Sequence, residues 1–212
     1  VEHIGTVDAV VVDFLGKNTQ TDGQFNVTVG TVNVHPLASF STHVDVIVQH
    51  FGTLNVVGDV AEPSAVIPNL YIPSSADAAV NVAGQLDNTQ RLVMTAGTLT
   101  IDGTMTSVDV QQSVATVKGS GAFTVSGIYR WVSGPWEGTN DFGSVTTVTH
   151  PGSLILISDA VKSVISRRVV TDCQVLWEAG GIYTASSSVW NHKQTSGDYA
   201  FLIQHGATSF NW

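Results

Sequence analysis

The chain has 212 residues, a length that suits one large domain or two small ones with a substantial core. Only 12% of the residues are charged and 43% are hydrophobic, and a chain this poor in charge and rich in Gly, Thr, Ser and Val favours strands over helices. With 17 acidic and 8 basic residues the formal net charge is -9, which repels a phosphate backbone and argues against a nucleic acid partner.

Five segments alternate apolar and polar residues with a period of two, the pattern of strands that bury one face. In chain order they are 25–34, 43–60, 91–105, 113–127 and 146–158. In the second of these, Val44, Val46 and Val48 point to one face. The segment with the most helix-like spacing, 159–170, is rich in β-branched residues, which argues against a helix. We therefore expect a chain that is nearly all β.

A turn signal of glycine, a small residue and an apolar residue recurs along the chain. It occurs at Gly5, Gly30, Gly52, Gly97, Gly121, Gly152, Gly180 and, in degraded form, Gly206. Counting the wide gap after Gly52 as two intervals gives a mean spacing of about 25 residues. An antiparallel sandwich would need hairpin turns every 8 to 12 residues or so, and Asp-Gly pairs occur only at 22–23 and 102–103. The spacing predicts a parallel β-solenoid of about 8 to 9 turns.

Segment 61–79 holds three of the six prolines and interrupts the repeat near residue 75. Because proline cannot donate to a central ladder, we expect a loop insertion there between two turns. We expect residues 1–212 to form one solenoid with this insertion. Val1 and the apolar stretch 207–212 offer no polar cap, so we expect the solenoid to be a segment of a longer protein or to pair with neighbours in a fibre.

The chain from Gly121 onward follows an ordered series of motifs. They are an apolar strand, a Trp-x-x-Gly motif, a glycine-rich corner, a Gly-x-Leu strand and a Lys-x-Leu-x-x-Arg segment. The matching positions are Trp131, Gly134, Gly138, Gly152, Leu154, Lys162, Val164, Arg167, Trp177, Gly180 and Asn191. Over roughly 90 residues this pattern resembles the repeats of large extracellular β-solenoid proteins, the adhesin-like and autotransporter-passenger-like group. Cys173 departs from the pattern, because such repeats often carry Asn or Gly there. The resemblance implies a right-handed coil and a non-enzymatic role as a stalk, adhesin or filament subunit.

Some right-handed β-helices are instead polysaccharide lyases, hydrolases or epimerases, which gather carboxylates on one exposed face. The acids of this chain are spread thinly, with no Asp-Asp or Asp-x-Asp pair. Arg167-Arg168 could mimic a lyase base, or could form a solvated rim or a corner salt link. His43 and Asp45 could begin a metal site, but two ligands do not complete one, so we expect neither metal nor cofactor. Cys173 is the only cysteine, which excludes an internal disulfide.

All five tryptophans lie in the last 82 residues, and exposed tryptophans can stack on sugar rings. Trp131 and Trp177 each lie three residues before a glycine, which favours a structural role over a glycine corner. Trp136 is not part of a motif that recurs in the chain, and with Glu137 it forms the candidate glycan-binding pair. The sequon Asn26-Val27-Thr28 is a candidate glycosylation site.

Together these features predict an all-β, right-handed parallel β-solenoid in an extracellular or cell-surface location. The expected role is a non-enzymatic structural or adhesive module, such as a stalk or filament subunit. Its expected partners are other copies or neighbouring domains of the same chain, with glycans as a further partner. No apolar run approaches the ~20 residues of a membrane-spanning helix, so no membrane insertion is expected. The alternatives are a polysaccharide-active β-helix enzyme and a glycan-binding module.

Overall fold

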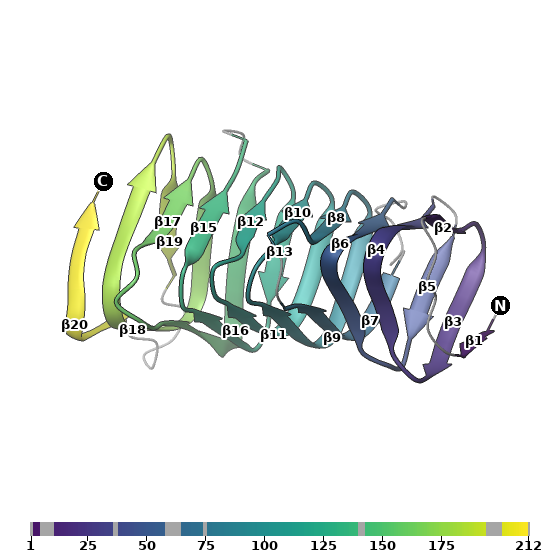
Figure 1. The fold of residues 1–212 in the computed structure, drawn as a ribbon. Coiled ribbons are helices and arrows are strands. Elements are labelled where there is room, and N and C mark those ends of the chain that lie inside the picture. Colours follow the sequence, from purple (N-terminus) through teal and green to yellow (C-terminus); the bar gives the residue numbers. More distant parts are fainter. Residues whose placement is uncertain are drawn as a thin grey trace.

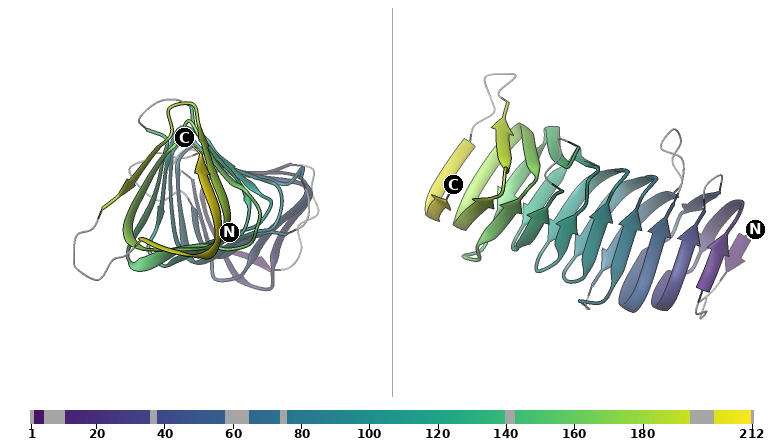
Figure 2. Two further views of the ribbon diagram at one scale, coloured as in Figure 1. Left: turned by 90° about the vertical axis from the view of Figure 1, so that its left-hand side faces the viewer. Right: turned by 90° about the horizontal axis from the view of Figure 1, so that it is seen from above.

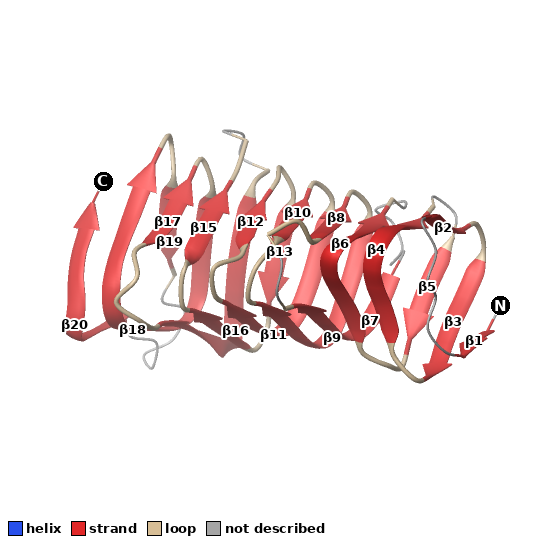
Figure 3. Ribbon diagram, in the orientation of Figure 1, coloured by secondary structure: helices blue, strands red, loops and turns tan. Residues whose placement is uncertain are grey.

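The computed structural model of the chain describes residues 2–4, 11–35, 38–57, 65–73, 76–139, 143–193 and 201–211. These residues form strands and connecting turns with no helix, and therefore no helix that could span a membrane (Figure 3). The strands stack like rungs from the N-terminal to the C-terminal end of an elongated coil (Figure 1). Their pairings are parallel, as in β4–β6 and β16–β18. The prediction of a parallel β-solenoid is confirmed, with about 8 turns.

Each turn contributes segments to three walls, and equivalent segments of successive turns pair side by side. Wall 1 consists of β1 (Glu2–Ile4), β3 (Lys17–Asp22), β5 (Ser39–Thr42), β13 (Ala122–Val125), β19 (Val189–His192) and the first parts of β7 (Ala65–Ile72), β9 (Gln85–Met94), β11 (Thr104–Gln112), β16 (Val145–Leu156) and β18 (Arg168–Ala185).

Wall 2 consists of β14 (Ile128–Trp131), the first parts of β4 (Phe25–Val34), β6 (Val46–Val56) and β20 (Phe201–Asn211), the second parts of β7, β9, β11 and β16, and the middle of β18. Wall 3 consists of β2 (Val11–Phe14), β8 (Ala79–Val82), β10 (Thr98–Ile101), β12 (Thr116–Lys118), β15 (Gly134–Glu137), β17 (Lys162–Ile165) and the last parts of β4, β6, β18 and β20. The corner between walls 2 and 3 is called corner 2–3 below, and the other two corners are named in the same way.

The coil is right-handed, as the resemblance implied. Seen from the C-terminal end, the described chain has a roughly triangular outline (Figure 2). β19 runs down one side of this outline, and β20, which lies nearer the viewer, runs along the base and up the other side. Such an anticlockwise advance defines a right-handed coil.

The glycine repeat in the sequence mixes three different corners. Gly30 and Gly52 stack directly at corner 2–3, where Gly97 and Gly180 also lie. Gly121 lies at corner 3–1, and Gly152 lies at corner 1–2 inside β16. One turn takes 18 residues from Thr98 to Thr116 but 28 from Gly134 to Lys162. The recurring glycines therefore mark the presence of corners without marking a fixed repeat length.

The expected loop insertion over 61–79 is wrong in its middle part. Residues 65–72 form β7, which pairs with β9 and buries Ile67, Leu70 and Ile72. Pro68 is accommodated because it lies at corner 1–2, where the register with β9 shifts between Ile67 and Asn69 and no ladder donor is needed. Residues 61–64 and 74–75 of the expected loop lie outside the described residues.

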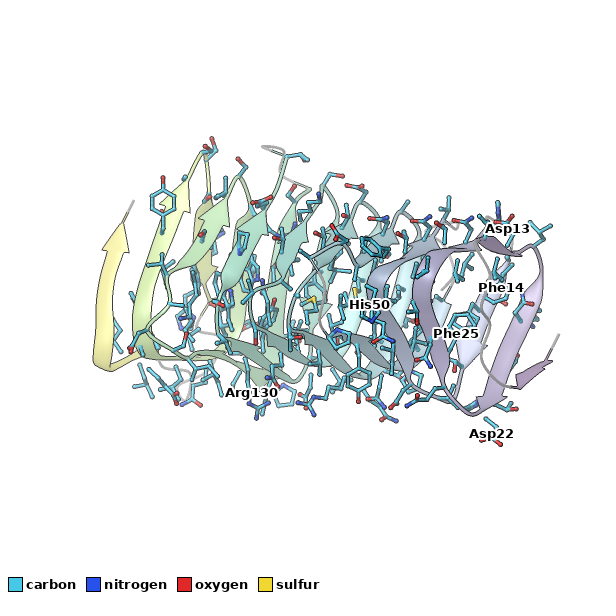
Figure 4. The ribbon with its side chains drawn as sticks, viewed as in Figure 1. Asp13, Phe14, Asp22, Phe25, His50 and Arg130 are labelled. Atoms are coloured by element: carbon cyan, nitrogen blue, oxygen red, sulfur yellow. The ribbon has the colours of Figure 1, made fainter. Side chains whose placement is uncertain are left out.

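The interior is filled by the apolar residues of the period-two pattern. In β5, β8, β10, β13 and β14 half-buried and buried side chains alternate strictly. Near the N-terminal end Phe14 stacks on Phe40 with ring centroids 5.1 Å apart, and Phe25 packs against both. Figure 4 shows Phe14 and Phe25 inside the coil and Asp13 on its outer side. The core enclosed by the three walls is thus mainly apolar.

Candidate functional site

Trp136, half of the expected glycan-binding pair, lies in the core. Its ring has no exposed surface and stacks on Trp131 with ring centroids 3.9 Å apart and planes only 4° from parallel. The register that pairs Trp136 with Val117 turns the side chain inward. A sugar needs an exposed aromatic face, and Trp136 offers none, so this part of the sequence-based expectation is wrong.

A buried polar network explains how the Trp136 ring is tolerated inside. Its Nε1–H donates to Gln112 Oε1 at 2.6 Å, and the Tyr129 hydroxyl donates to the same oxygen at 2.6 Å. Gln112 Nε2 in turn donates to the carbonyl oxygen of Ala115 at 2.7 Å. Burial raises the pKa of Tyr129 well above its ordinary value, so the phenol stays protonated and keeps donating. The network is therefore satisfied internally and serves the fold.

The two Trp-x-x-Gly motifs build the same corner. Trp131 Nε1–H donates to the carbonyl oxygen of Gly134 at 3.0 Å, and Trp177 Nε1–H donates to that of Gly180 at 2.9 Å. Both glycines have positive φ, 95° and 78°. The ring therefore caps the corner at which its glycine turns the chain. The expectation of a structural role for Trp131 and Trp177 is confirmed.

Glu137 ends β15 and its side chain is half-buried. Its backbone carbonyl oxygen accepts a hydrogen bond from Arg167 Nη1 at 3.3 Å. With the Trp136 ring buried, the two residues do not form one exposed site. A contact between the Glu137 carboxylate and a glycan stays a prediction.

Arg167, considered above as a lyase base or a corner salt link, is only 1% exposed. Its guanidinium donates to Thr146 Oγ1 at 2.8 Å and to backbone carbonyl oxygens of Val145 at 3.0 Å and Gly119 at 3.1 Å. Burial lowers its pKa to about 10. A guanidinium enclosed by carbonyls of two earlier turns links three turns at corner 3–1 and does not face a substrate.

Lys162 has a comparable structural role at corner 2–3. Its ammonium donates to the carbonyl oxygens of Ala160 at 2.9 Å and Ser158 at 3.1 Å, and its side chain is buried. Burial lowers its pKa to about 8. Cys173 is also buried, and burial raises its thiol pKa to about 11, so the thiol is protonated at neutral pH.

The candidate glycosylation residue, Asn26, lies within β4 on wall 2, where it pairs with Ile47. Its side chain is half-buried, and its Oδ1 atom is enclosed without a hydrogen-bond partner. A glycan would attach to Nδ2 instead, so glycosylation of Asn26 stays a prediction.

His43 and Asp45 were considered as the first two ligands of a metal site. Asp45 Oδ1 accepts a hydrogen bond from Asn69 Nδ2 of the next turn at 2.9 Å. Among the described residues, no three His, Cys, Asp or Glu side chains gather closely enough to hold a metal ion.

Sequence reasoning missed an amide ladder on the outside of wall 3. Asn81 donates to Asn55, Asn55 donates to Asn33, and Asn33 donates to Asp13, with N–O distances of 2.9, 2.8 and 2.8 Å. His35 Nε2 lies 3.1 Å from the same Asp13 oxygen. These hydrogen bonds lower the pKa of Asp13. The signal in the sequence was an Asn or Asp two residues after the start of each of the first four wall 3 segments, in β2, β4, β6 and β8.

Exposed aromatic side chains of the kind sought at Trp136 lie elsewhere in the described residues, at Phe51 and at Tyr183, which is 45% exposed. Phe51 is 66% exposed at corner 2–3 of β6, beside Val29, which is 61% exposed at the same corner of β4. His50, next to Phe51, is also exposed. Alternation in "VDVIVQHF" turns Phe51 outward, as observed, but it would turn His50 inward, and the bulge at the corner leaves His50 exposed instead.

The fold and these residues define the class of the protein as a right-handed parallel β-solenoid with a hydrogen-bonded interior. Comparisons with protein-family models, with curated proteins and with solved structures find no match to this chain.

Proposed function

We propose that the chain is a non-enzymatic structural or adhesive module of an extracellular or cell-surface assembly, in which its coils stack on neighbouring coils to extend a stalk or filament. The neighbours are other copies of the chain or adjoining domains of the same long chain. The proposal keeps the role implied by the resemblance to adhesin-like and autotransporter-passenger-like repeats.

The observation that carries the proposal is the pairing of the outermost strands among the described residues. Within the described residues, β19 and β20 pair with β18 on one side, and β1 and β2 pair with β3 and β4. The opposite edge of such a strand presents backbone N–H and C=O groups that can pair with another strand. Leu202 and Ile203 of β20 are 43% and 63% exposed, and Val189 of β19 is 45% exposed.

The burial of several large polar and aromatic side chains supports the same proposal. Trp131, Trp136, Tyr129, Lys162 and Arg167 are buried and hydrogen-bonded to corner carbonyls or to one another. Side chains that would be candidates for catalysis or ligand binding on a surface therefore stabilise the coil itself.

The test is the assembly state of the purified chain over a range of concentrations, measured by light scattering after gel filtration and by negative-stain electron microscopy. We expect linear oligomers that lengthen with concentration. The double variant Leu202→Lys and Ile203→Lys should shorten them, because lysine on an edge strand opposes pairing. Val114→Lys is the control, since Val114 is 72% exposed at a central corner. A chain that stays monomeric at every concentration, or oligomers that the double variant leaves unchanged, would contradict stacking between copies.

A further inference from the structure

The corner patch is a small exposed surface at corner 2–3 of β4 and β6, formed by Thr28, Val29, Gln49, His50 and Phe51. Val29 and Phe51 pair across the two turns and are 61% and 66% exposed. Figure 4 shows His50 where β6 bends from wall 2 to wall 3. Phe51 is the one phenylalanine among the large hydrophobic residues that the described part of the chain exposes.

A β-bulge creates the patch. One residue separates Val27 from Val29 in β4, whereas two residues, Gln49 and His50, separate their partners Val48 and Phe51 in β6. The extra residue, His50, has a φ of 54°, in the left-handed region that glycine occupies at this corner in other turns, such as Gly97 and Gly180. Bulges redirect side chains, and a strained non-glycine residue at a surface is a reason to look for a function.

The patch rests on a rigid base. A Cβ atom at Gly52, next to Phe51, would lie only 2.0 Å from the carbonyl oxygen of Val27, so the two turns pack closely there and leave no room for a side chain. The nearby inward side chains of β6, Val48 and Leu54, are completely buried. The Phe51 side chain is therefore displayed on a fixed backbone, and little conformational entropy would be lost by the backbone on binding.

The chemistry of the patch fits a sugar. An exposed aromatic ring can pack against the apolar C–H face of a pyranose. Polar side chains flank it: Gln49 Nε2 donates to Thr28 Oγ1 at 3.4 Å, and the His50 imidazole can donate to or accept from a hydroxyl group. Two apolar side chains on a convex corner match one sugar ring and are too few for the apolar centre of a stable protein interface.

We propose that the corner patch binds a neutral sugar unit of an oligosaccharide, with Phe51 as the stacking ring and His50 and Gln49 as hydrogen-bonding groups. The net charge of -9 opposes acidic sugars and leaves neutral ones as the favoured class. The site is distinct from the coil ends on which the proposed structural role depends.

The experiment titrates the chain with cellohexaose, chitohexaose and mannohexaose and follows binding by saturation-transfer NMR. We expect at least one of them to bind, Phe51→Ala to weaken that binding about tenfold or more, and Phe51→Trp to strengthen it through its larger ring. The matched control is Val114→Ala, an exposed side chain at the same type of corner in another turn, which should bind as the parent does. His50→Gly relieves the left-handed strain, so it should weaken binding without lowering thermal stability.

Absence of binding to all three sugars at millimolar concentration would overturn the proposal, as would equal effects of Phe51→Ala and Val114→Ala. If Phe51→Ala instead abolished oligomer formation and no sugar bound, the patch would be a protein contact and the sugar assignment would be wrong. Sugar binding that persists in a monomeric chain would support this proposal even if the stacking proposal failed.

Discussion

At the scale of single residues, corner 2–3 is closed in successive turns by inward side chains of different chemistry. Gln112, Trp131, Lys162 and Trp177 each donate an N–H to a carbonyl oxygen of the corner. A carbonyl left unsatisfied inside the coil would cost about 1–3 kcal/mol. The donors differ in chemistry, but each removes the same penalty.

The positive φ of the corner glycines leads to a prediction for Gly134. Its φ is 95°, and an added Cβ would lie 2.2 Å from the carbonyl oxygen of Ala115. We expect Gly134→Ala to lower the free energy of unfolding by at least about 2 kcal/mol, measured by guanidinium denaturation. Gly16→Ala is the control, because nothing lies within 4 Å of its added Cβ. Equal destabilisation by the two substitutions would show that backbone packing at corner 2–3 does not limit stability.

Lys162 gives a prediction for the pH dependence of stability. Burial lowers its pKa to about 8 in the folded chain, against an ordinary value of 10.5 in the unfolded one. Between these values the unfolded chain holds a proton that the folded chain has released, so rising pH favours folding. Relative to Lys162→Met, the parent should gain stability from pH 8 to pH 10.5, on the order of 2 kcal/mol.

The difference between the two proteins is the quantity to measure, by denaturation at a series of pH values. The raised pKa values of Tyr129 and Cys173 lower the stability of both proteins as pH rises, and this effect cancels in the difference. A difference that is flat from pH 8 to pH 10.5 would mean that the Lys162 ammonium keeps its ordinary pKa despite burial.

At the scale of elements, the Asn ladder couples the third-wall strands β2, β4, β6 and β8 on their outer side. Each amide donates toward the N-terminal end, and the ladder ends on the Asp13 carboxylate, which can only accept while it is ionised. Hydrogen bonds to an ionised acceptor are the stronger kind. The ladder therefore has a direction, and its order of residues matters.

Asn55→Asp tests that direction. The new carboxylate could still accept from Asn81 but could no longer donate to Asn33, and two acceptors would face each other. We expect a loss of about 1–2 kcal/mol at pH 7. The loss should shrink as pH falls through the raised pKa of the new carboxyl, because its protonated form can donate. Asn191→Asp in β19 is the control, and a cost equal at both sites, or independent of pH, would contradict a working ladder.

The alternation of apolar residues was sufficient to predict the strands, and the Trp-x-x-Gly motifs predicted two corner caps correctly. The sequence did not predict whether a side chain at or just after a corner points into the core or toward solvent. Strict alternation from Trp131 would turn Trp136 outward, but the chain turns at Gly134 and Pro135 and the Trp136 side chain points inward. Alternation from Val48 would turn His50 inward, but the bulge in β6 leaves His50 exposed. Both directions depend on corner geometry that period-two counting does not contain.

At the scale of the whole molecule, a solenoid contacts itself only between neighbouring turns, so its local stability depends on position along the coil. Strands in central turns, such as β9 and β11, pair with turns on both sides. Within the described residues, β19 and β20 pair on one side. Free energies of local opening should therefore rise from the ends toward the centre.

Hydrogen exchange measured by mass spectrometry tests this gradient. In dilute solution we expect amides of β9 and β11 to exchange at least about tenfold more slowly than those of β19 and β20. Uniform protection would instead indicate that the coil opens as one cooperative unit. Repeating the measurement at high protein concentration adds a second comparison. If copies stack end to end, β19 and β20 should gain protection while β9 is unchanged, because only the end strands would acquire a new parallel neighbour.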